Sequence, residues 1–347
     1  MEKTMKAALF YGQQDIRISE VKMPQTKEGE VLIRVAAAGI CGSDARIYYQ
    51  GGEERYKIPV ILGHEVTGEV SQIGKNVDGF RVGERVIVAP IYGCGKCSFC
   101  VSGKENLCEK VIVFGCNFDG AFAEYMKIPS RAIQAGALVK IAEDLSDEEA
   151  VLIEPFSCCL HGELRAQVQP GDTVLVIGTG PIGLAHIKLL RFLGAARIIA
   201  SEVVEWRLKK AREFGADITI NSHSEDVLKR IRQLTENRGV DAVIVAVGNP
   251  QAIMQGLKAV RPGGTVVVFG GCPPKSTIQV DPNLIHYSDV SVVGSIDATM
   301  DEFRRMASLV PAMKVKPLVS HRFPLESIKD ALEVMKTREA LKVMIKF

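Results

Sequence analysis

The sequence predicts an α/β protein with two domains, a compact β domain and a doubly wound domain built on a parallel sheet. At 347 residues the chain is longer than one hydrophobic core normally organises. Short β-type runs separated by glycines fill residues 1 to about 90, whereas apolar strands alternate with amphipathic helices from about residue 170 onward. We therefore predict a β domain over 1–153 and 294–347 and a parallel-sheet domain over 154–293.

The individual elements follow from these patterns. In the β domain, strand-like runs stand at 7–9, 31–37, 65–73 and 85–89. In the parallel-sheet domain, we predict strands at 173–177, 197–201, 218–220, 241–246, 265–269 and 290–293, with helices at 182–193, 205–214, one ending at 234 and one ending at 260. A helix at 300–310 and short strands at 319–322 and 343–347 complete the chain, and we expect this tail to return to the first domain.

Four cysteines lie close together at about 90–112. Cys94, Cys97, Cys100 and Cys108 have the spacing at which four thiolates converge on one tetrahedral metal ion. Such a site has no open coordination position, so we predict a structural zinc rather than a catalytic one. Clustered buried or disulfide-paired cysteines are the alternative, but nine cysteines is an odd number and the N-terminus carries no secretion signal. A reducing cytoplasm is the expected location.

A glycine-rich turn opens the parallel-sheet domain. The apolar strand 173–177 runs directly into Gly178, Gly180, Ile182 and Gly183, in the pattern that places a pyrophosphate at a helix N-terminus. Gly178 allows a tight turn, Gly180 allows backbone amides to approach the phosphates, and Gly183 allows the helix to pack closely on the strand. The sequence therefore predicts a dinucleotide site in a Rossmann domain.

Two residues bear on the choice of dinucleotide. Glu202 ends the next predicted strand at about the distance expected for the acid that binds the ribose hydroxyls, and it would repel the 2′-phosphate of NADP. Arg207 follows in the next helix, where it stacks on adenine or pairs with a phosphate. We predict NAD rather than NADP from the acid.

Composition excludes several classes of protein. With 47% apolar and 24% charged residues the chain is globular, and no run approaches the ~20 apolar residues of a membrane span. A formal net charge of +2 provides no field for nucleic acid. We expect neither a membrane nor a nucleic acid as partner.

The chain as a whole resembles the zinc-dependent medium-chain alcohol dehydrogenases. Besides the cysteine lobe, the glycine loop and Glu202, the matching motifs are Cys41-Gly-Ser-Asp44, Gly63-His-Glu65 and Glu154-Pro155, all in the family's order and rough spacing. Glu154 stands where the alcohol-oxidising branch has a cysteine, so the chain is most similar to the sorbitol (polyol) and threonine dehydrogenase branches. The resemblance implies a GroES-like β domain followed by a Rossmann domain.

The resemblance also implies a catalytic zinc, and hence two zinc ions per chain. Cys41 and His64 would be ligands, with either Glu154 or Glu65 as the remaining protein ligand, and Asp44 would orient the imidazole of His64. Taken singly, a lone cysteine and a lone histidine are more typical of core residues, and a simple turn or cap residue is an open alternative for Asp44. An oxygen ligand makes the site harder than a purely thiolate one, which suits a diol or an amino alcohol.

Proton transfer and substrate binding depart from the family pattern. Ser43 is similar to the hydroxyl that takes the alcohol proton, but Arg46 stands where related enzymes have a histidine, and a guanidinium cannot accept a proton. Glu154, acting through a water, is the substitute acceptor that we predict. Asp297 replaces an arginine that polyol dehydrogenases tend to carry, so the substrate pocket differs from theirs.

These features predict an NAD-dependent zinc dehydrogenase that takes a hydride from a secondary alcohol of a polyol or sugar-like substrate. An L-threonine 3-dehydrogenase is the nearest alternative. A non-catalytic zinc-ribbon protein and a relative without the active zinc are the others, although the lobe's nearly balanced charge does not favour nucleic acid. By analogy with the family we expect a homodimer or homotetramer, with the region of Val292 at the interface.

Overall fold

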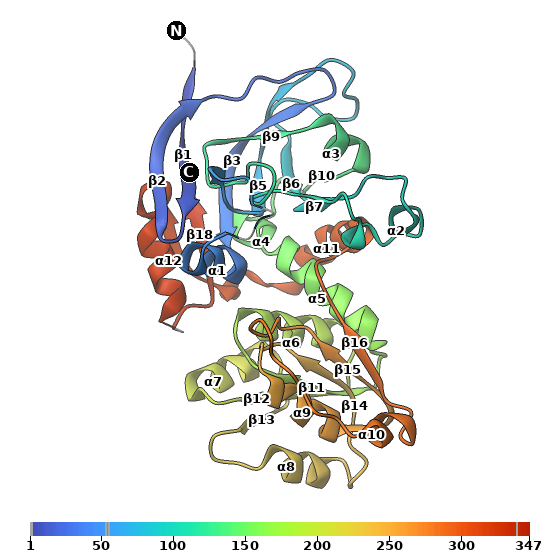
Figure 1. Cartoon of the computed structure of the whole chain (residues 1–347). Coiled ribbons are helices and arrows are strands. Elements are labelled where there is room, and N and C mark those ends of the chain that lie inside the picture. The colour runs from blue at the N-terminus through green and yellow to red at the C-terminus, as the bar shows by residue number, and fades with distance from the viewer. Residues whose placement is uncertain (1–2, 53, 55, 338) are drawn as a thin grey trace. The chain divides into compact units, whose positions relative to one another are not determined.

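The computed structural model describes residues 3–52, 54, 56–337 and 339–347. The chain forms two compact units, Met1–Glu154 with Thr299–Phe347, and Pro155–Ala298 (Figure 1). The second unit thus starts at Pro155 rather than 154 and extends to Ala298 rather than 293. Residues 1–2, 53, 55 and 338, which the predicted first domain includes, lie outside the described residues. None of the described helices is long and apolar enough to cross a membrane.

The first unit is built on β-sheets. Its largest sheet has the strand order β10-β6-β5-β3-β18-β17, and β9 also pairs with β3. The bounds are β3 (Val31–Ile40), β5 (Glu65–Ile73), β6 (Arg85–Val88), β9 (Tyr125–Ile128), β10 (Leu138–Lys140), β17 (Val319–Pro324) and β18 (Lys342–Lys346). Two smaller sheets contain β1 (Thr4–Gly12), β2 (Asp15–Lys22) and β4 (Val60–Ile61), and β7 (Ile91–Tyr92) with β8 (Ile112–Val113).

The last strand of the chain lies beside one of the first. β18 pairs antiparallel with β3, with Val343 opposite Ile40 and Met344 opposite Gly39. β3 in turn pairs antiparallel with β5, where Gly39 lies opposite Glu65. Three segments that are far apart in sequence therefore run side by side through the first unit (Figure 1).

Short helices complete the first unit. Helix α11 begins with a capping box in which Thr299 and Glu302 bond to each other's backbone amides. It buries Phe303, Met306 and Val310 at helical spacing. The helices are α1 (Gly42–Gln50), α2 (Ser98–Val101), η1 (Glu105–Leu107), α3 (Ser130–Ala135), α4 (Asp147–Ala150), α11 (Met300–Met313), η2 (Lys316–Leu318), η3 (Leu325–Ser327) and α12 (Ile328–Lys336), while α5 (Ile153–Ala166) leads into the second unit.

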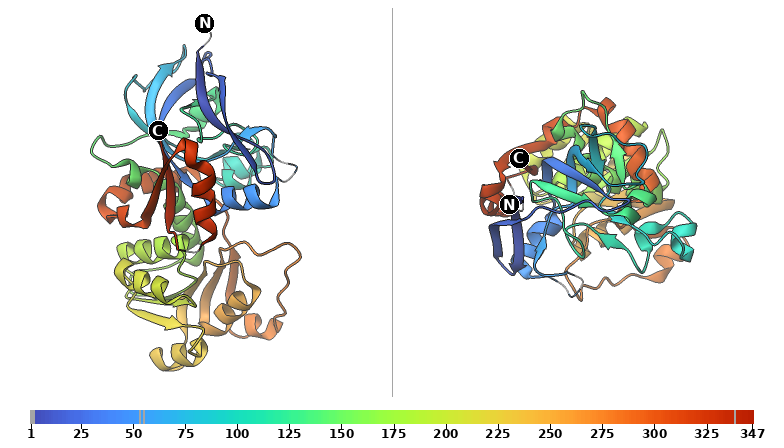
Figure 2. Two further views of the ribbon diagram at one scale, coloured as in Figure 1. Left: turned by 90° about the vertical axis from the view of Figure 1, so that its left-hand side faces the viewer. Right: turned by 90° about the horizontal axis from the view of Figure 1, so that it is seen from above.

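The second unit contains a six-stranded parallel sheet with the order β13-β12-β11-β14-β15-β16. Helices cover both of its faces (Figure 2), which confirms the predicted doubly wound fold. The strands are β11 (Thr173–Ile177), β12 (Arg197–Glu202), β13 (Ile218–Asn221), β14 (Val240–Val245), β15 (Val260–Val268) and β16 (Ser291–Gly294). The helices are α6 (Pro181–Leu193), α7 (Glu205–Phe214), α8 (Val227–Leu234), α9 (Pro250–Ala259) and α10 (Pro282–His286).

Helix α6 starts one residue earlier than predicted. Its first residue is Pro181 and its N-cap is Gly180. Proline suits this position, because its fixed φ matches a helix and the first helical residue needs no amide hydrogen. The glycine turn is therefore shorter, and the first free amide of the helix is that of Ile182.

Close backbone packing against Gly120 and Ala121 holds Gly63, two residues before β5, in place. A Cβ atom on Gly120 would lie 2.1 Å from the carbonyl oxygen of Gly63, and the amide of Ala121 donates a hydrogen bond to that same oxygen. Gly63 itself has a φ of +89°, which favours glycine. His64 follows directly, so this backbone packing sets the position of its side chain.

We expect Gly120→Ala to destabilise the protein by about 1–3 kcal/mol, the usual cost of forcing an extra methyl group into a packed region. Urea unfolding followed by circular dichroism measures the change. Gly271→Ala is the matched control, since a Cβ at Gly271 meets nothing within 4 Å. Equal stability of the two variants would contradict the packing described here.

Candidate metal and dinucleotide sites

Three potential metal ligands converge in the first unit. Ligand atoms of Cys41, His64 and Glu65 all lie within 4.8 Å of one another. Cys41 is the N-cap of α1 directly after β3, and His64 and Glu65 stand at the start of the neighbouring β5. A thiolate, an imidazole and a carboxylate are each ligands of zinc in proteins, and the size of the cluster fits one ion.

Asp44 supports two members of this cluster. Its Oδ2 accepts a hydrogen bond from the amide of Cys41 at 2.9 Å, and its Oδ1 lies 3.5 Å from Nδ1 of His64. Burial lowers the pKa of His64, but the charge of Asp44 and the hydrogen bonds of the imidazole to Asp44 and Cys41 outweigh it and raise the pKa well above its ordinary value. Since Nδ1 faces Asp44, Nε2 is the nitrogen left for a metal ion.

Glu65 is held by a buried lysine. Nζ of Lys342 lies 2.6 Å from Oε1 and 2.8 Å from Oε2 of Glu65, and both side chains are almost completely buried. Burial lowers the pKa of Lys342, but Glu65 and Cys41 outweigh it, so that the pKa is raised and the lysine stays charged. Gly39 gives the carboxylate its space, because a Cβ there would lie 2.0 Å from Oε2 of Glu65.

The other two predicted catalytic residues, Glu154 and Ser43, are not part of the Cys41–His64–Glu65 cluster of described residues. Glu154 is 9% exposed, on the first turn of α5, and among the described residues it is not part of the group within 4.8 Å. Its negative charge nevertheless contributes to the raised pKa of Lys342. Ser43 is half-buried at the second position of α1, and Arg46 is exposed one turn further on.

The four cysteines of the lobe form a second cluster. The Sγ–Sγ distances are 4.0 Å for Cys94–Cys100, 3.5 Å for Cys97–Cys100 and 3.8 Å for Cys97–Cys108. Sulfurs bound at ~2.3 Å to one tetrahedral zinc are about 3.8 Å apart, whereas a disulfide needs ~2.05 Å. The geometry fits a closed zinc site and excludes disulfides.

The thiols of the lobe differ in acidity. Backbone amides of Lys96 and Cys97 lower the pKa of Cys94 to about 6, whereas burial raises the pKa of Cys100 to about 12. A metal cation favours the thiolate form of a cysteine whose pKa is raised, so zinc binding at this lobe is expected to release protons. Glu105 ties the lobe to α11 by accepting a hydrogen bond from the amide of Met300.

The glycine loop of the second unit has the packing that its pattern predicts. Gly178 has a φ of +91°, and a Cβ on Gly183 would lie 1.9 Å from the carbonyl oxygen of Gly178. Around Gly180 there is open space, since the nearest atom to a Cβ would be Nη1 of Arg207 at 3.9 Å. Ile182 lies in the first turn of α6, whose N-terminus favours anions.

Glu202 is fixed beside this loop. Its Oε2 accepts a hydrogen bond from the amide of Thr179 at 2.9 Å, and its Oε1 accepts one from the amide of Val203 at 2.8 Å. Nη1 of Arg207 lies 4.0 Å from Oε2, and its guanidinium carbon is 5.5 Å from the ring centre of Trp206. The carboxylate is thus anchored at the end of β12, with one positive charge next to it.

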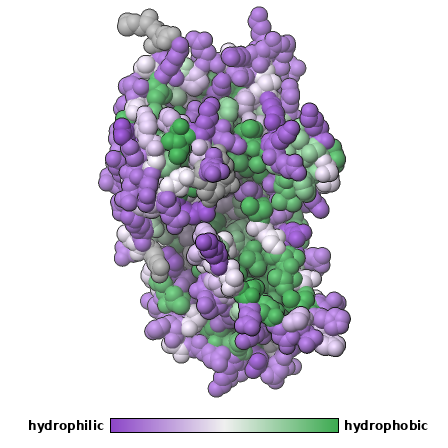
Figure 3. Space-filling model, viewed as in Figure 1, coloured by the Kyte–Doolittle hydropathy of each residue, from purple (hydrophilic) through white to green (hydrophobic). Residues whose placement is uncertain are grey.

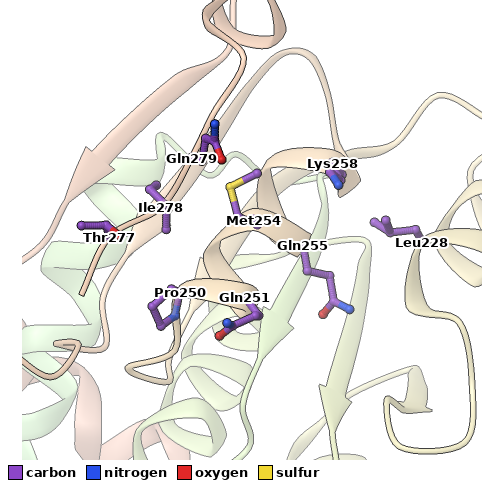
Figure 4. A pocket seen from close by; sticks show the side chains of 9 residues that line it. All are labelled: Leu228, Pro250, Gln251, Met254, Gln255, Lys258, Thr277, Ile278 and Gln279. Carbon is purple, nitrogen blue, oxygen red and sulfur yellow. The ribbon is translucent and has the colours of Figure 1, made fainter.

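A separate groove of about 410 Å³ lies elsewhere on the second unit. Met254 of α9 and Ile278 of the segment before α10 contribute to it (Figure 4). Its lining contains none of the predicted site residues. It is therefore distinct from both the metal clusters and the glycine loop.

Comparison with known proteins identifies the family. Residues 27–141 match the family model "alcohol dehydrogenase GroES-like domain", and residues 181–312 match "zinc-binding dehydrogenase". The chain belongs to the zinc-dependent medium-chain alcohol dehydrogenases. It is an oxidoreductase that acts on alcohol donors, and the alternative of a non-catalytic zinc-ribbon protein is excluded.

Relatives within this dehydrogenase family differ in substrate and cofactor. The chain is 36% identical to a sorbitol dehydrogenase of Bacillus subtilis, over 99% of this chain and 97% of the relative, and 35% identical to an L-threonine 3-dehydrogenase of Bacillus licheniformis, over 99% of both. Two solved structures are 30% identical to it. A zinc-binding dehydrogenase of Sinorhizobium meliloti bound to NADP has a TM-score of 0.92 over all of both chains, and an Escherichia coli alcohol dehydrogenase with NADH has 0.91 over 99% of both.

Sequence reasoning missed two residues of this dehydrogenase. Lys342 gave no signal, because a lysine at the start of a short terminal strand is usually exposed. Thr179 stood inside the glycine motif, but only the fold shows that its amide and hydroxyl both face Glu202. The one sequence feature that could have indicated Thr179 is that it is a polar residue between Gly178 and Gly180.

For the lobe, we expect Cys100→Ser to lose one zinc per chain and to lower the thermal unfolding temperature, since a structural zinc contributes directly to folding. Zinc is measured by atomic emission after dialysis. Cys272→Ser is the matched control, because Cys272 belongs to neither metal cluster. Full zinc retention by Cys100→Ser would contradict a four-thiolate site.

Proposed function

We propose that this protein is an NAD-dependent dehydrogenase that oxidises a secondary alcohol of a polyol or sugar-like substrate at a zinc ion held by Cys41 and His64. The observation that carries the proposal is the convergence of a thiolate, an imidazole and a carboxylate in the first unit. A bound zinc supplies Lewis acidity, which lowers the pKa of an alcohol. The four-cysteine lobe holds a second, structural zinc.

The protein residues around this zinc have distinct roles in the proposal. Asp44 holds the imidazole of His64 and the backbone of Cys41 in place. Ser43 accepts the alcohol proton in the first step of its transfer. Beyond Ser43 the exposed guanidinium of Arg46 is no proton acceptor, so Glu154 takes that role or completes the metal shell.

NAD is the proposed cofactor. Glu202 is anchored by backbone amides at the end of β12, where a carboxylate binds the ribose hydroxyls and repels a 2′-phosphate. Arg207 lies close enough to offset part of that repulsion. The orientation of the carboxylate, fixed from both of its oxygens, supports NAD over NADP.

The mixed ligand set supports the substrate class. Oxygen donors among the ligands make the site harder than a thiolate-rich one and suit a chelating diol. An L-threonine 3-dehydrogenase uses the same chemistry and is the second candidate.

A homo-oligomer is also part of the proposal. Strand β16 is the last strand of its sheet, and its side chains are largely exposed, with Val292 at 40%. Figure 3 shows apolar side chains gathered on the face of the second unit. An exposed sheet edge of this kind is suited to pair with a second copy. The cytoplasmic location stays a prediction.

A substrate panel tests the main proposal. With the zinc-loaded protein and NAD, we expect NADH formation from polyols, and His64→Asn should lower kcat/KM on the order of 10³-fold, because several kcal/mol of transition-state stabilisation depend on the metal. His286→Asn, on an exposed position of α10, is the control. Faster turnover of L-threonine than of every polyol would favour the second candidate, and full activity of His64→Asn would refute both.

Cofactor choice is tested at Glu202. We expect Glu202→Ala to raise the ratio of kcat/KM with NADP to kcat/KM with NAD at least about tenfold, because it removes a carboxylate close to the 2′-phosphate. Glu205 is an exposed acid and the first residue of α7, so Glu205→Ala should leave the ratio unchanged. A preference for NADP in the unmodified protein would overturn the assignment.

A further inference from the structure

We propose that Lys342 is a positioning residue that competes with the catalytic metal for the carboxylate of Glu65, so that Glu65 is a displaceable rather than a permanent ligand. This inference rests on the proposed function, since it requires a metal ion at Cys41 and His64.

Lys342 contacts the same atoms of Glu65 that a metal ion would bind. Nζ of Lys342 lies 2.6 and 2.8 Å from the two oxygens of Glu65, so it occupies the edge of the carboxylate between them. A metal ion that binds a carboxylate through both oxygens uses the same edge. Lys342 Nζ also lies 3.4 Å from the carbonyl oxygen of Ile40, which holds the ammonium from a second direction.

Burial gives this contact its strength. Glu65 is completely buried and Lys342 is 4% exposed, so neither charge exchanges its partner for water. A buried carboxylate needs a cation beside it. Among the described residues the ammonium of Lys342 contacts Glu65, and the proposed metal ion is the other candidate.

The sheet fixes the positions of both competitors. Lys342 opens β18, Cys41 follows β3 and Glu65 opens β5, and these strands are direct neighbours in the order β5-β3-β18. Gly39, opposite Glu65, leaves the carboxylate a defined space between them. The side chain of Glu65 therefore only has to shift within this space to pass from one cation to the other.

The consequence is an open coordination position. When Lys342 holds Glu65, a metal ion at Cys41 and His64 has one protein ligand fewer and keeps a position for the alcohol oxygen, as catalytic zinc sites require. When Glu65 joins the metal, that position closes. Lys342 thus biases the site toward the form that binds substrate.

The proposal is tested by whether replacing Lys342 strengthens or weakens metal binding at the Cys41–His64 site. A residue that merely supports a ligand weakens metal binding by about 10- to 100-fold when it is removed. A competitor does the opposite. We therefore expect Lys342→Met to bind Co²⁺ at the Cys41–His64 site at least about tenfold more tightly than the unmodified protein, measured by competition with a chelator. The visible absorption of Co²⁺ should also weaken, because a higher coordination number lowers its intensity.

Five further proteins control the experiment. The spectrum of Cys41→Ser, which retains the cysteine lobe, is subtracted so that only the Cys41–His64 site is seen. Lys342→Arg keeps the charge and should behave like the unmodified protein. Lys342→Gln donates an uncharged hydrogen bond to Glu65, so it provides the same test if Lys342→Met does not fold. In Glu65→Gln/Lys342→Met, affinity should match that of Glu65→Gln alone.

Two results overturn the proposal: unchanged or weaker Co²⁺ binding in both Lys342→Met and Lys342→Gln, or tighter binding that persists after Glu65 is replaced by glutamine. A failure of the proposed function looks different. In that case the unmodified protein itself shows no thiolate-to-cobalt absorption beyond that of Cys41→Ser.

Discussion

The completely buried carboxylate of Glu65 is the constraint on which the metal site of the first unit depends. An ionised group without water requires a cation in contact with it, because its desolvation otherwise costs several kcal/mol. Lys342 supplies that cation from the last strand of the chain, and Gly39 on the strand between them supplies the space. The position of β18 beside β3 is therefore as much a requirement of charge as of packing.

Elements and their bounds follow closely from sequence wherever the apolar pattern is regular. The predicted strands 65–73 and 173–177 and the helix 205–214 coincide with β5, β11 and α7. The order of strands in the sheet of the first unit does not follow from such patterns, because periodicity shows which residues share a face but not which strand is the neighbour. Cys41 and His64 were paired through resemblance for this reason, and Lys342 was not found at all.

In the second unit the functional residues lie within one strand-turn-helix-strand segment. Gly178 and Glu202 are separated by the single helix α6, which contains Gly183, and parallel strands joined by a helix are adjacent in space. Sequence spacing therefore sufficed to predict that the acid stands beside the glycine turn. What it did not show is that the amides of Thr179 and Val203 bind the carboxylate, so that this negative charge is fixed in direction before any dinucleotide binds.

The two metal clusters show the same contrast between local and distant contacts. The four cysteines of the lobe come from one short segment, and their sulfur separations are those of a closed tetrahedral site. The Cys41–His64–Glu65 cluster comes from the ends of two strands, and the described cation that contacts Glu65 is Lys342 of a third strand, 277 residues away from Glu65 in sequence. The closed site has no vacant position, whereas the proposed open site has to keep an extra carboxylate from filling one. The cation that does so lies outside every motif, and it enters the site only when the last strand has joined the sheet.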